Sequence, residues 1–210
     1  MALLSIPFTL LADAKLRAAR SILRLRLRVR HPSLRCDPTA ILDYPFGRLD
    51  AFSLGVGVRI MPFCEIVVIP SSRFSATEGR LVLGDDVVIA AGANIRAAGG
   101  VIRIGNGSGV GQYSVLVAAN HQLVLGEPYF KLPWDEDKTG VEIGANVWIG
   151  AHCVLLPGTR VGDHSVVAAG SVVNGAIPAG ELWGGVPARR LKAIPTRESL
   201  ERALGAAQTS

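Results

Sequence analysis

From Ile143 to Pro178 the sequence reads IGANVW, IGAHCV, LLPGTR, VGDHSV, VAAGSV and VNGAIP, which are six consecutive blocks of six residues. The first residue of each block is aliphatic, the second is usually Gly or Ala, and the fifth is small in most blocks. A period of six matches neither an α-helix nor a flat strand. Blocks of the same kind begin upstream at Leu83, Ile89, Ile104 and Val110.

A short strand followed by a tight corner explains this period. Three blocks, or 18 residues, close one turn of a triangular coil whose aliphatic first positions point inward. Gly or Ala at the second position tolerates the tight backbone, and the small fifth position fits beneath the corner. Stacked turns then bury an aliphatic column and pair as parallel sheets. The alternative is an ordinary parallel α/β sheet, but amphipathic segments of helix length do not separate the repeats. The sequence therefore predicts an all-β coil.

The register breaks three times, and we expect a loop to leave a corner at each break. The first break surrounds Pro70–Ser72, and the second lies between Ile95 and Ile104 around Gly99-Gly100. The third lies between Leu116 and Ile143 and contains a loop over residues 122–140. Loops that leave a rigid scaffold often carry function.

Three segments are predicted along the chain. Residues 1–50 form a basic cap segment, residues 51–184 form the coil with its inserted loop, and residues 185–210 form a turn and a short helix. The helix is expected after Pro195, with Thr196 as its N-cap. Residues 15–24 have helical spacing, but the strict alternation of Leu or Val with Arg over residues 23–30 predicts a half-buried strand.

Composition and charge exclude several classes of protein. Among 210 residues, 49% are hydrophobic, 19% are charged and only 6% are aromatic, which describes a folded chain with a core of small aliphatic side chains. The net charge of +5 lies in residues 1–50, which hold nine basic and four acidic residues, whereas residues 51–210 hold 13 of each. A nucleic-acid-binding body would be basic on its binding face, so no nucleic-acid partner is predicted.

Cysteines and hydropathy point to a cytoplasmic protein. The three cysteines, Cys36, Cys64 and Cys153, are far apart and suit free thiols in a reducing compartment. The apolar stretch near residues 3–12 is too short to span a bilayer. Basic residues follow this stretch rather than precede it, which is the wrong order for a secretory signal. His152 and His164 sit within repeats and should point outward, and no metal site is predicted.

The repeat continues into motifs with a fixed order and spacing, namely NVWIGA at 146–151, LPG at 156–158, AGSVV at 169–173 and GVPAR at 185–189. With these motifs the sequence resembles the hexapeptide-repeat acyltransferases, which fold as a left-handed parallel β-helix. It is most similar to the branch of maltose, galactoside and xenobiotic acetyltransferases and polysaccharide O-acetyltransferases. The resemblance runs from about Leu54 to Leu191, and residues 1–50 lie outside it.

The resemblance implies a homotrimer whose active sites lie between neighbouring coils, and direct transfer of an acetyl group from acetyl-CoA to a hydroxyl of a small-molecule or glycan acceptor. It places the general base at His121, just before the large loop. Gln122 follows, where sugar acetyltransferases often have proline. A carbonyl or a carboxylate should orient the imidazole, and Glu127 is one candidate.

The resemblance also assigns residues to the donor. The backbone N–H of Ala151 would stabilise the oxyanion, and Trp148, which the repeat phase directs outward, would pack on pantetheine or on a neighbouring subunit. Arg189 and Lys192 would meet the phosphates of coenzyme A, although surface charge is the alternative for both. Backbone at Ala169, Asn174 and Gly175 would line the pantetheine channel. Asn94, before the second break, would either bond the acceptor near His121 or be a solvated corner residue.

Two other functions stay open at this point. One is an acyl-carrier-protein-dependent or N-acyltransferase that acts on a nucleotide sugar, and the other is a non-catalytic scaffold. The arginine-rich N-terminal segment has three interpretations. It covers the first turn of the coil, it lies on an anionic membrane surface, or it docks an acidic acyl carrier protein.

Overall fold

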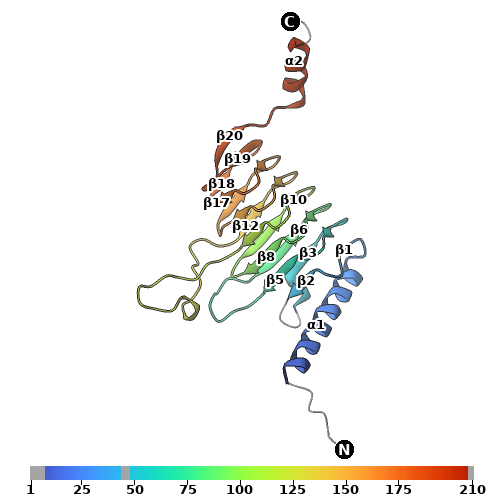
Figure 1. Cartoon of the computed structure of the whole chain (residues 1–210), viewed down its shortest axis with the longest axis vertical. Helices are drawn as coiled ribbons and strands as arrows, with labels where there is room; N and C mark the ends of the chain where they lie inside the picture. Colours follow the sequence, from blue (N-terminus) through green and yellow to red (C-terminus); the bar gives the residue numbers. More distant parts are fainter. Residues whose placement is uncertain (1–7, 44–47, 208–210) are drawn as a thin grey trace, which may run out of the picture.

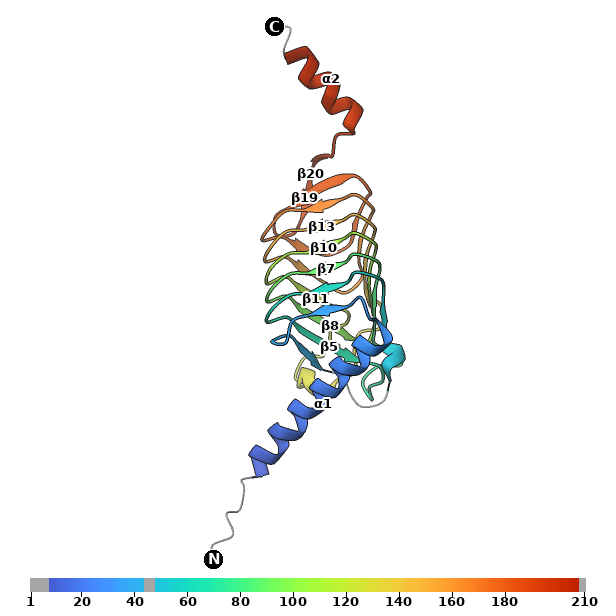
Figure 2. The same ribbon diagram turned by 90° about the vertical axis from the view of Figure 1, so that its right-hand side faces the viewer.

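Three β-sheets run along the molecule and form a three-sided coil in the computed structural model, which describes residues 8–43 and 48–207, with side chains over 15–43 and 48–202 (Figures 1 and 2). Successive strands belong to successive sheets, so the chain visits the three sheets in turn. The strands β1–β18 therefore make six three-sided turns, and β19 begins a seventh. Partners such as Trp148 and Val166 are 18 residues apart, as the period predicts.

The strands are short and follow one another from sheet to sheet. The first sheet contains β1 (Arg35–Cys36), β4 (Arg59–Ile60), β7 (Val88–Ile89), β10 (Gly109–Val110), β13 (Trp148–Ile149), β16 (Val166–Val167), β19 (Glu181–Gly184) and β20 (Arg189–Ala193), of which β20 is antiparallel to β19. The second contains β2 (Ile41–Asp43), β5 (Glu65–Ile69), β8 (Asn94–Ala98), β11 (Val115–Val117), β14 (Val154–Leu155) and β17 (Val172–Val173). The third contains β3 (Phe52–Leu54), β6 (Arg80–Leu83), β9 (Val101–Ile104), β12 (Val141–Ile143), β15 (Thr159–Val161) and β18 (Ala176–Ile177).

The core is the predicted aliphatic column. First-position residues such as Ile149, Leu155 and Val167 are completely buried. At the small fifth position, the hydroxyls of Ser114 and Ser165 are buried and donate hydrogen bonds to carbonyls of the next turn, at 2.9 and 2.8 Å. These bonds remove the free-energy penalty of a buried hydroxyl. Cys153, which occupies a fifth position, is also buried.

Glycine at the second position has a different cause from the one predicted. A Cβ on Gly105 would lie 2.5 Å from the backbone of Gly144 in the next turn, so glycine is needed because two backbones approach closely. The left-handed conformation falls two residues later in the block, for example at Asn146, His152 and His164, whose φ angles are 53°, 56° and 58°. Both histidines are exposed, as predicted.

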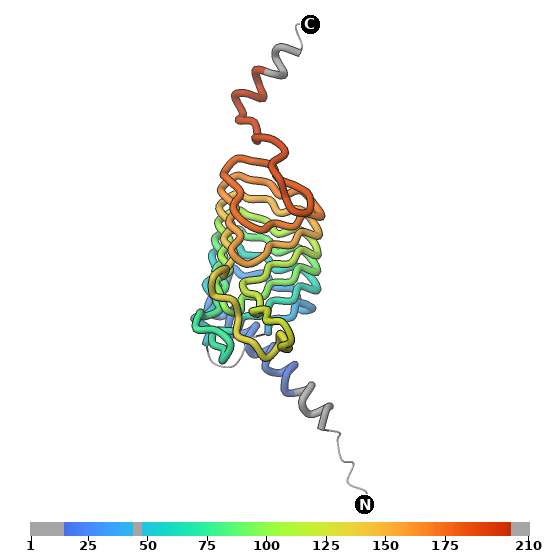
Figure 3. Tube along the Cα trace, turned by 90° about the vertical axis from the view of Figure 1, so that its left-hand side faces the viewer, coloured from blue at the N-terminus to red at the C-terminus, as the bar shows by residue number. Residues whose placement is uncertain are grey.

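All three breaks in the register fall at one edge of the coil, between the second and third sheets. Residues 70–79 leave the coil between β5 and β6, and residues 118–140 leave it between β11 and β12 (Figure 3). The prediction of a loop at the middle break is wrong. There β8 and β9 continue to Gly99-Gly100 and meet at that corner, where a Cβ on Gly99 would strike the ring of Trp134.

The predicted strand over residues 23–30 is also wrong, because helix α1 runs from Phe8 to Arg30. Leu23 and Leu27 are buried against the first turn of the coil. Arg24 and Arg28 donate to the carbonyls of Ala40 and Cys36, both at 2.9 Å. Arginines at a spacing of four thus donate hydrogen bonds to free carbonyl groups at the start of the coil. Helix α1 covers this open end of the coil (Figure 2).

The C-terminal helix is present where it was predicted. Helix α2 spans Arg197–Ala207, and the Thr196 hydroxyl accepts a hydrogen bond of 3.2 Å from the backbone N–H of Ser199. This is the geometry of an N-cap. Neither this helix nor α1 has the length and apolar character required to cross a bilayer.

Candidate active site

His121 lies just after β11, where the long loop leaves the coil, and two residues of that loop hold its ring. Its Nδ1 lies 3.0 Å from the carbonyl oxygen of Leu132, and its Nε2 lies 3.2 Å from the indole Nε1 of Trp134. The backbones of His121 and Trp134 also form an antiparallel β-bridge. The predicted carbonyl partner is therefore that of Leu132, and Glu127 is not needed for this role.

These two contacts define the tautomer of His121. A carbonyl oxygen only accepts and an indole N–H only donates, so Nδ1 carries the proton and Nε2 presents its lone pair. A neutral imidazole with a lone pair on Nε2 is the form that can accept a proton from a substrate.

Aromatic rings surround the imidazole. The centroids of Tyr129, Phe74 and Trp134 lie 5.7, 5.9 and 6.0 Å from that of His121, all with edge-to-face geometry. Tyr129 belongs to the short 3₁₀ helix η2 (Tyr129–Lys131) of the long loop, whereas Phe74 comes from the loop over residues 70–79. Two loops that are far apart in the sequence therefore build the walls around one ring.

A pocket of about 800 Å³ opens beside His121. Polar groups from Asn120, Asp135 and Asp137 line it together with the phenol ring of Tyr129. Among the described residues that line this pocket, none is Lys or Arg. Carboxylates and amides accept hydrogen bonds from hydroxyl groups, and an aromatic face packs against the apolar side of a ring, so this lining suits a polyhydroxyl compound without negative charge.

Glu136 fastens the long loop to the shorter one. Its carboxylate accepts hydrogen bonds from the hydroxyls of Ser75 and Thr77, at 2.6 and 2.5 Å, and from the backbone N–H of Ala76 at 3.1 Å. The Ser75 and Thr77 hydroxyls hold the pKa of this carboxyl below its ordinary value. The backbone N–H of Trp134 donates to the carbonyl of Phe74 at 2.7 Å and completes the junction.

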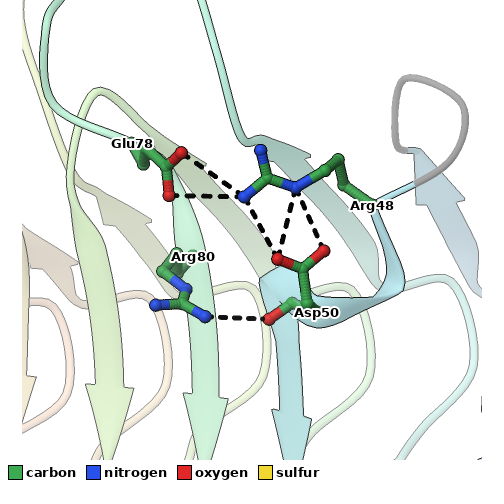
Figure 4. A network of polar contacts seen from close by, with 4 residues as sticks. All are labelled: Arg48, Asp50, Glu78 and Arg80. Carbon is green, nitrogen blue, oxygen red and sulfur yellow. Dashed lines mark hydrogen bonds and ion pairs between the residues drawn. The ribbon is translucent and has the colours of Figure 1, made fainter.

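The base of the shorter loop is held by a second polar network (Figure 4). The guanidinium of Arg48 contacts Asp50 at 3.1 Å and Glu78 at 3.3 Å, while Arg80 donates to the carbonyl of Asp50 at 3.2 Å. The Arg48 hydrogen bond lowers the pKa of Asp50. These side chains are exposed, and such pairs contribute little stability singly, but together they fix where the loop re-enters the coil.

Removal of the Glu136 clamp should release the long loop from the shorter one. In Glu136→Ala we expect faster amide hydrogen exchange across the 122–140 loop, which carries Trp134 and Leu132, because the hydrogen bonds of the carboxylate to the shorter loop are lost. The clamp needs a carboxylate with a depressed pKa, so its stabilisation is present above the ordinary pKa of glutamate and is lost as the pH falls through the lower folded-state value.

Limited proteolysis of the 122–140 loop gives a second measurement. Cleavage there should accelerate in Glu136→Ala and stay at the wild-type rate in Glu127→Ala, which changes a carboxylate in the same loop. Equal protection of both variants would contradict the role of Glu136 as a clamp.

Three of the seven residues predicted for the donor, Trp148, Arg189 and Lys192, lie on the first sheet, away from His121. Trp148 pairs with Val166, Val166 with Leu182, and Leu182 with Lys192. Trp148 and Lys192 are therefore in one row, about 14 Å apart over three strand spacings. Both are exposed, and Trp148 shows 64% of its surface, as its outward direction predicted. Arg189 is exposed at the start of β20.

The remaining predicted donor residues divide between two edges. Ala151 and Ala169 lie at the corner between the first and second sheets, where the N–H of Gly170 bonds the carbonyl of Ala151 at 2.9 Å. Asn174 and Gly175 lie at the edge between the second and third sheets, which is the edge that carries the two loops.

Asn94 is placed apart from the pocket around His121. It pairs with Val115 at the start of β11, and its amide donates to Glu65 at 2.7 Å. The pocket is lined by other residues. The side-chain Oδ1 of Asn94 is buried and has no hydrogen-bond partner among the described groups.

Sequence reasoning missed the residues that hold His121. Trp134, Leu132, Phe74 and Glu136 lie in the two loops, outside the six-residue period. A carboxylate beside a tryptophan within an insertion is a weak signal, and only the folded loops join them to Ser75, which is 61 residues from Glu136. Among the described residues, His, Cys, Asp and Glu form no group that could hold a metal ion.

The resemblance to the hexapeptide-repeat transferases is confirmed. Residues 140–175 match the family model of the bacterial transferase hexapeptide with six repeats, and these residues are β12–β17 with their corners. Over these residues the chain therefore carries the hexapeptide repeat of bacterial transferases.

Two bacterial relatives are O-acetyltransferases by name. The chain is 47% identical over 58 residues to galactoside O-acetyltransferase of Escherichia coli K12. It is 45% identical over 56 residues to the putative lipopolysaccharide biosynthesis O-acetyl transferase WbbJ of the same strain. Each match covers 29% of the relative's length and 28% or 27% of this chain.

Solved structures share the fold over most of the chain. AntD, an N-acyltransferase from Bacillus cereus in complex with dTDP-4-amino-4,6-dideoxyglucose and coenzyme A, has a TM-score of 0.63 and 20% identity, and the alignment covers 85% of this chain and 89% of AntD. A maltose O-acetyltransferase from Clostridium difficile 630 has a TM-score of 0.57 and 23% identity, covering 70% of this chain and 72% of that one. At these identities the likeness concerns the fold.

Proposed function

We propose that the protein transfers an acetyl group from acetyl-CoA to a hydroxyl of a sugar or glycan precursor, with His121 as the general base. The observation that carries this proposal is the oriented, neutral imidazole of His121 beside a polar pocket of about 800 Å³. The O-acetyltransferase relatives, which match 58 and 56 residues of the chain, support the reaction class. The same resemblance leads us to infer that the coil is left-handed.

Proton transfer at Nε2 is the central step. An acceptor hydroxyl that replaces the Trp134 N–H at Nε2 loses its proton there as its oxygen attacks the thioester carbonyl. The Nδ1–H of the imidazolium stays bonded to the Leu132 carbonyl, which stabilises the positive charge. The imidazolium then returns the proton to the leaving thiolate of coenzyme A. A base of this kind contributes about 10²–10⁴-fold.

The lining of the pocket favours hydroxyl acceptors over anionic ones. Asp135 and Asp137 would accept hydrogen bonds from acceptor hydroxyls, and Tyr129 would pack on a sugar ring. The two carboxylates would repel a diphosphate group placed in the same pocket. This charge is a specific reason to prefer a sugar or a neutral glycan unit to a nucleotide sugar at this position.

The donor would bind between two copies of the chain. In one copy, His121 lies at the edge between the second and third sheets, opposite the first sheet, which carries Trp148 and Lys192. A trimer in which the loop edge of one coil faces the first sheet of its neighbour would bring base and donor residues together. Trp148 would then pack on pantetheine, and the backbone N–H of Ala151 would stabilise the oxyanion.

The phosphates of coenzyme A should make Arg189 a donor residue. In Arg189→Glu we expect the KM for acetyl-CoA to rise at least tenfold, because a charge-assisted contact becomes repulsive, while the KM for the acceptor stays within about twofold. Added salt should raise the wild-type KM for acetyl-CoA as well. Arg160→Glu, on the exposed face of the third sheet, is the matched control, and an equal effect of both changes would remove the assignment.

An acceptor screen tests the proposal directly. Free thiol release from acetyl-CoA is followed with monosaccharides, oligosaccharides, lipid-linked glycans and nucleotide sugars. We expect turnover with a neutral sugar or glycan and little with a nucleotide sugar. Turnover confined to nucleotide sugars, or acyl transfer from an acyl carrier protein but not from acetyl-CoA, would contradict the proposal.

A further inference from the structure

The side of α1 that faces away from the coil carries an apolar stripe. Ile22, Leu25 and Val29 recur at helical spacing and expose 53%, 64% and 74% of their surfaces, while Leu23 and Leu27 on the other side are buried. A single exposed aliphatic residue is ordinary, but three in line on one helix form a patch. Helix α1 is therefore apolar on two faces, of which the coil covers only one.

Arginines flank this stripe. Residues 15–30 include seven basic residues and no acidic one. Three of the seven, Arg20, Arg24 and Arg28, bond the first turn of the coil. Arg26 is exposed and lies one helical turn from both Ile22 and Val29, and the exposed Arg30 lies one turn beyond Arg26 on the same side of the stripe. The outward side of α1 thus combines an apolar stripe with positive charge at its border.

We propose that α1 docks the protein on an anionic membrane surface, with Ile22, Leu25 and Val29 in the acyl boundary and Arg26 and Arg30 at the lipid phosphates. An apolar helix face bordered by arginines is the pattern of interfacial helices.

Two other partners fit the surface less well. A second copy of the chain offers no excess of negative charge, because residues 51–210 hold 13 basic and 13 acidic residues. An acidic carrier protein would match the arginines but would leave the stripe without a continuous apolar surface. An anionic bilayer supplies both an apolar layer and a plane of negative charge.

The position of α1 relates this surface to the pocket of His121. In all three views the 122–140 loop lies toward the end of the coil that α1 covers (Figures 1, 2 and 3). If the proposed acetyl transfer is correct, docking would hold the pocket near the headgroups, where a lipid-linked glycan acceptor would be presented. The docking itself does not depend on the transfer reaction.

Vesicle binding of the full chain tests the proposal. We expect sedimentation with vesicles of equimolar phosphatidylcholine and phosphatidylglycerol, weaker binding at high salt, and at least tenfold weaker binding to pure phosphatidylcholine. The variant I22S/L25S/V29S should lose more than about tenfold in affinity, because its apolar contacts with the lipid are removed. The variant R26Q/R30Q should lose about fivefold for each arginine.

Matched controls separate the stripe from general surface effects. V56S/F63S removes two exposed apolar side chains from the coil, and Arg103→Gln removes an exposed charge from the third sheet. Both should bind vesicles like the wild type. Thiol release with a soluble acceptor should be unchanged in I22S/L25S/V29S, so failure of docking and failure of the proposed transfer are distinguishable.

Three outcomes would overturn the proposal. The first is that the wild-type chain fails to bind anionic vesicles at low salt, and the second is that the two α1 variants bind as the wild type does. The third is that light scattering shows an altered oligomeric mass for I22S/L25S/V29S. The last outcome would make the stripe a subunit interface.

Discussion

Replacement of His121 by alanine should lower kcat by about 10²–10⁴-fold, the contribution expected of a positioned general base. The acceptor hydroxyl then has no group at Nε2 to take its proton, while the first sheet, with Trp148 and Lys192, is unaltered. Acetyl-CoA should therefore bind with nearly the wild-type affinity. Steady-state thiol release gives kcat, and calorimetry gives the affinity for the donor.

The control for this change is His164→Ala. His164 is an exposed histidine that occupies a corner of the coil with a φ of 58° and lies outside the pocket around His121. It should retain wild-type turnover. If His121→Ala turned over normally, the mechanism would be wrong. If His121→Ala lost donor binding together with turnover, His121 would be a structural residue rather than the base.

The walls of the coil could be predicted because one physical requirement repeats along the sequence. Every aliphatic first position must point inward, as Ile149 and Val167 do, so the period alone indicates strands, corners and core. The same logic predicted the outward direction of Trp148. The sequence shows glycine at the second position, but not its cause. That cause is the close approach of stacked backbones, which becomes apparent only when turns pack on one another.

Helix α1 shows where a periodic pattern misleads. Alternating Leu and Arg predicts a strand, yet a helix buries Leu23 and Leu27 and still places Arg24 and Arg28 over free carbonyls of the first turn. Long arginine side chains can lie beside apolar surface while their guanidinium groups reach polar partners. Tertiary contacts with the end of the coil therefore outweigh the local pattern.

The site around His121 could be predicted only in part. The position of His121 before a long insertion pointed to it, but the groups that hold its ring come from loops without any period. Trp134 and Leu132 contact His121 from a loop that Glu136 fastens to Ser75 and Thr77. Contacts between two irregular loops depend on the folded backbone and leave no spacing in the sequence.

Hybrid trimers should recover activity that neither parent possesses. We expect His121→Ala and the double variant W148A/R189E each to be nearly inactive at low acetyl-CoA, the first for lack of a base and the second for lack of donor contacts. If each site combines His121 of one copy with Trp148 and Arg189 of the next, a 1:1 mixture reassembled at random should regain about one quarter of wild-type activity, because one head-to-tail neighbour pair in four is intact.

Refolding the two variants together, with each refolded alone as the control, gives the measurement, and light scattering reports whether trimers form. A site built within one copy predicts no recovery at any ratio, because every copy then carries one defect. Recovery that peaks at the equal mixture requires base and donor residues from different copies. A chain that stays monomeric and active would contradict the shared site, because in one copy His121 lies at the edge opposite the sheet that carries Trp148.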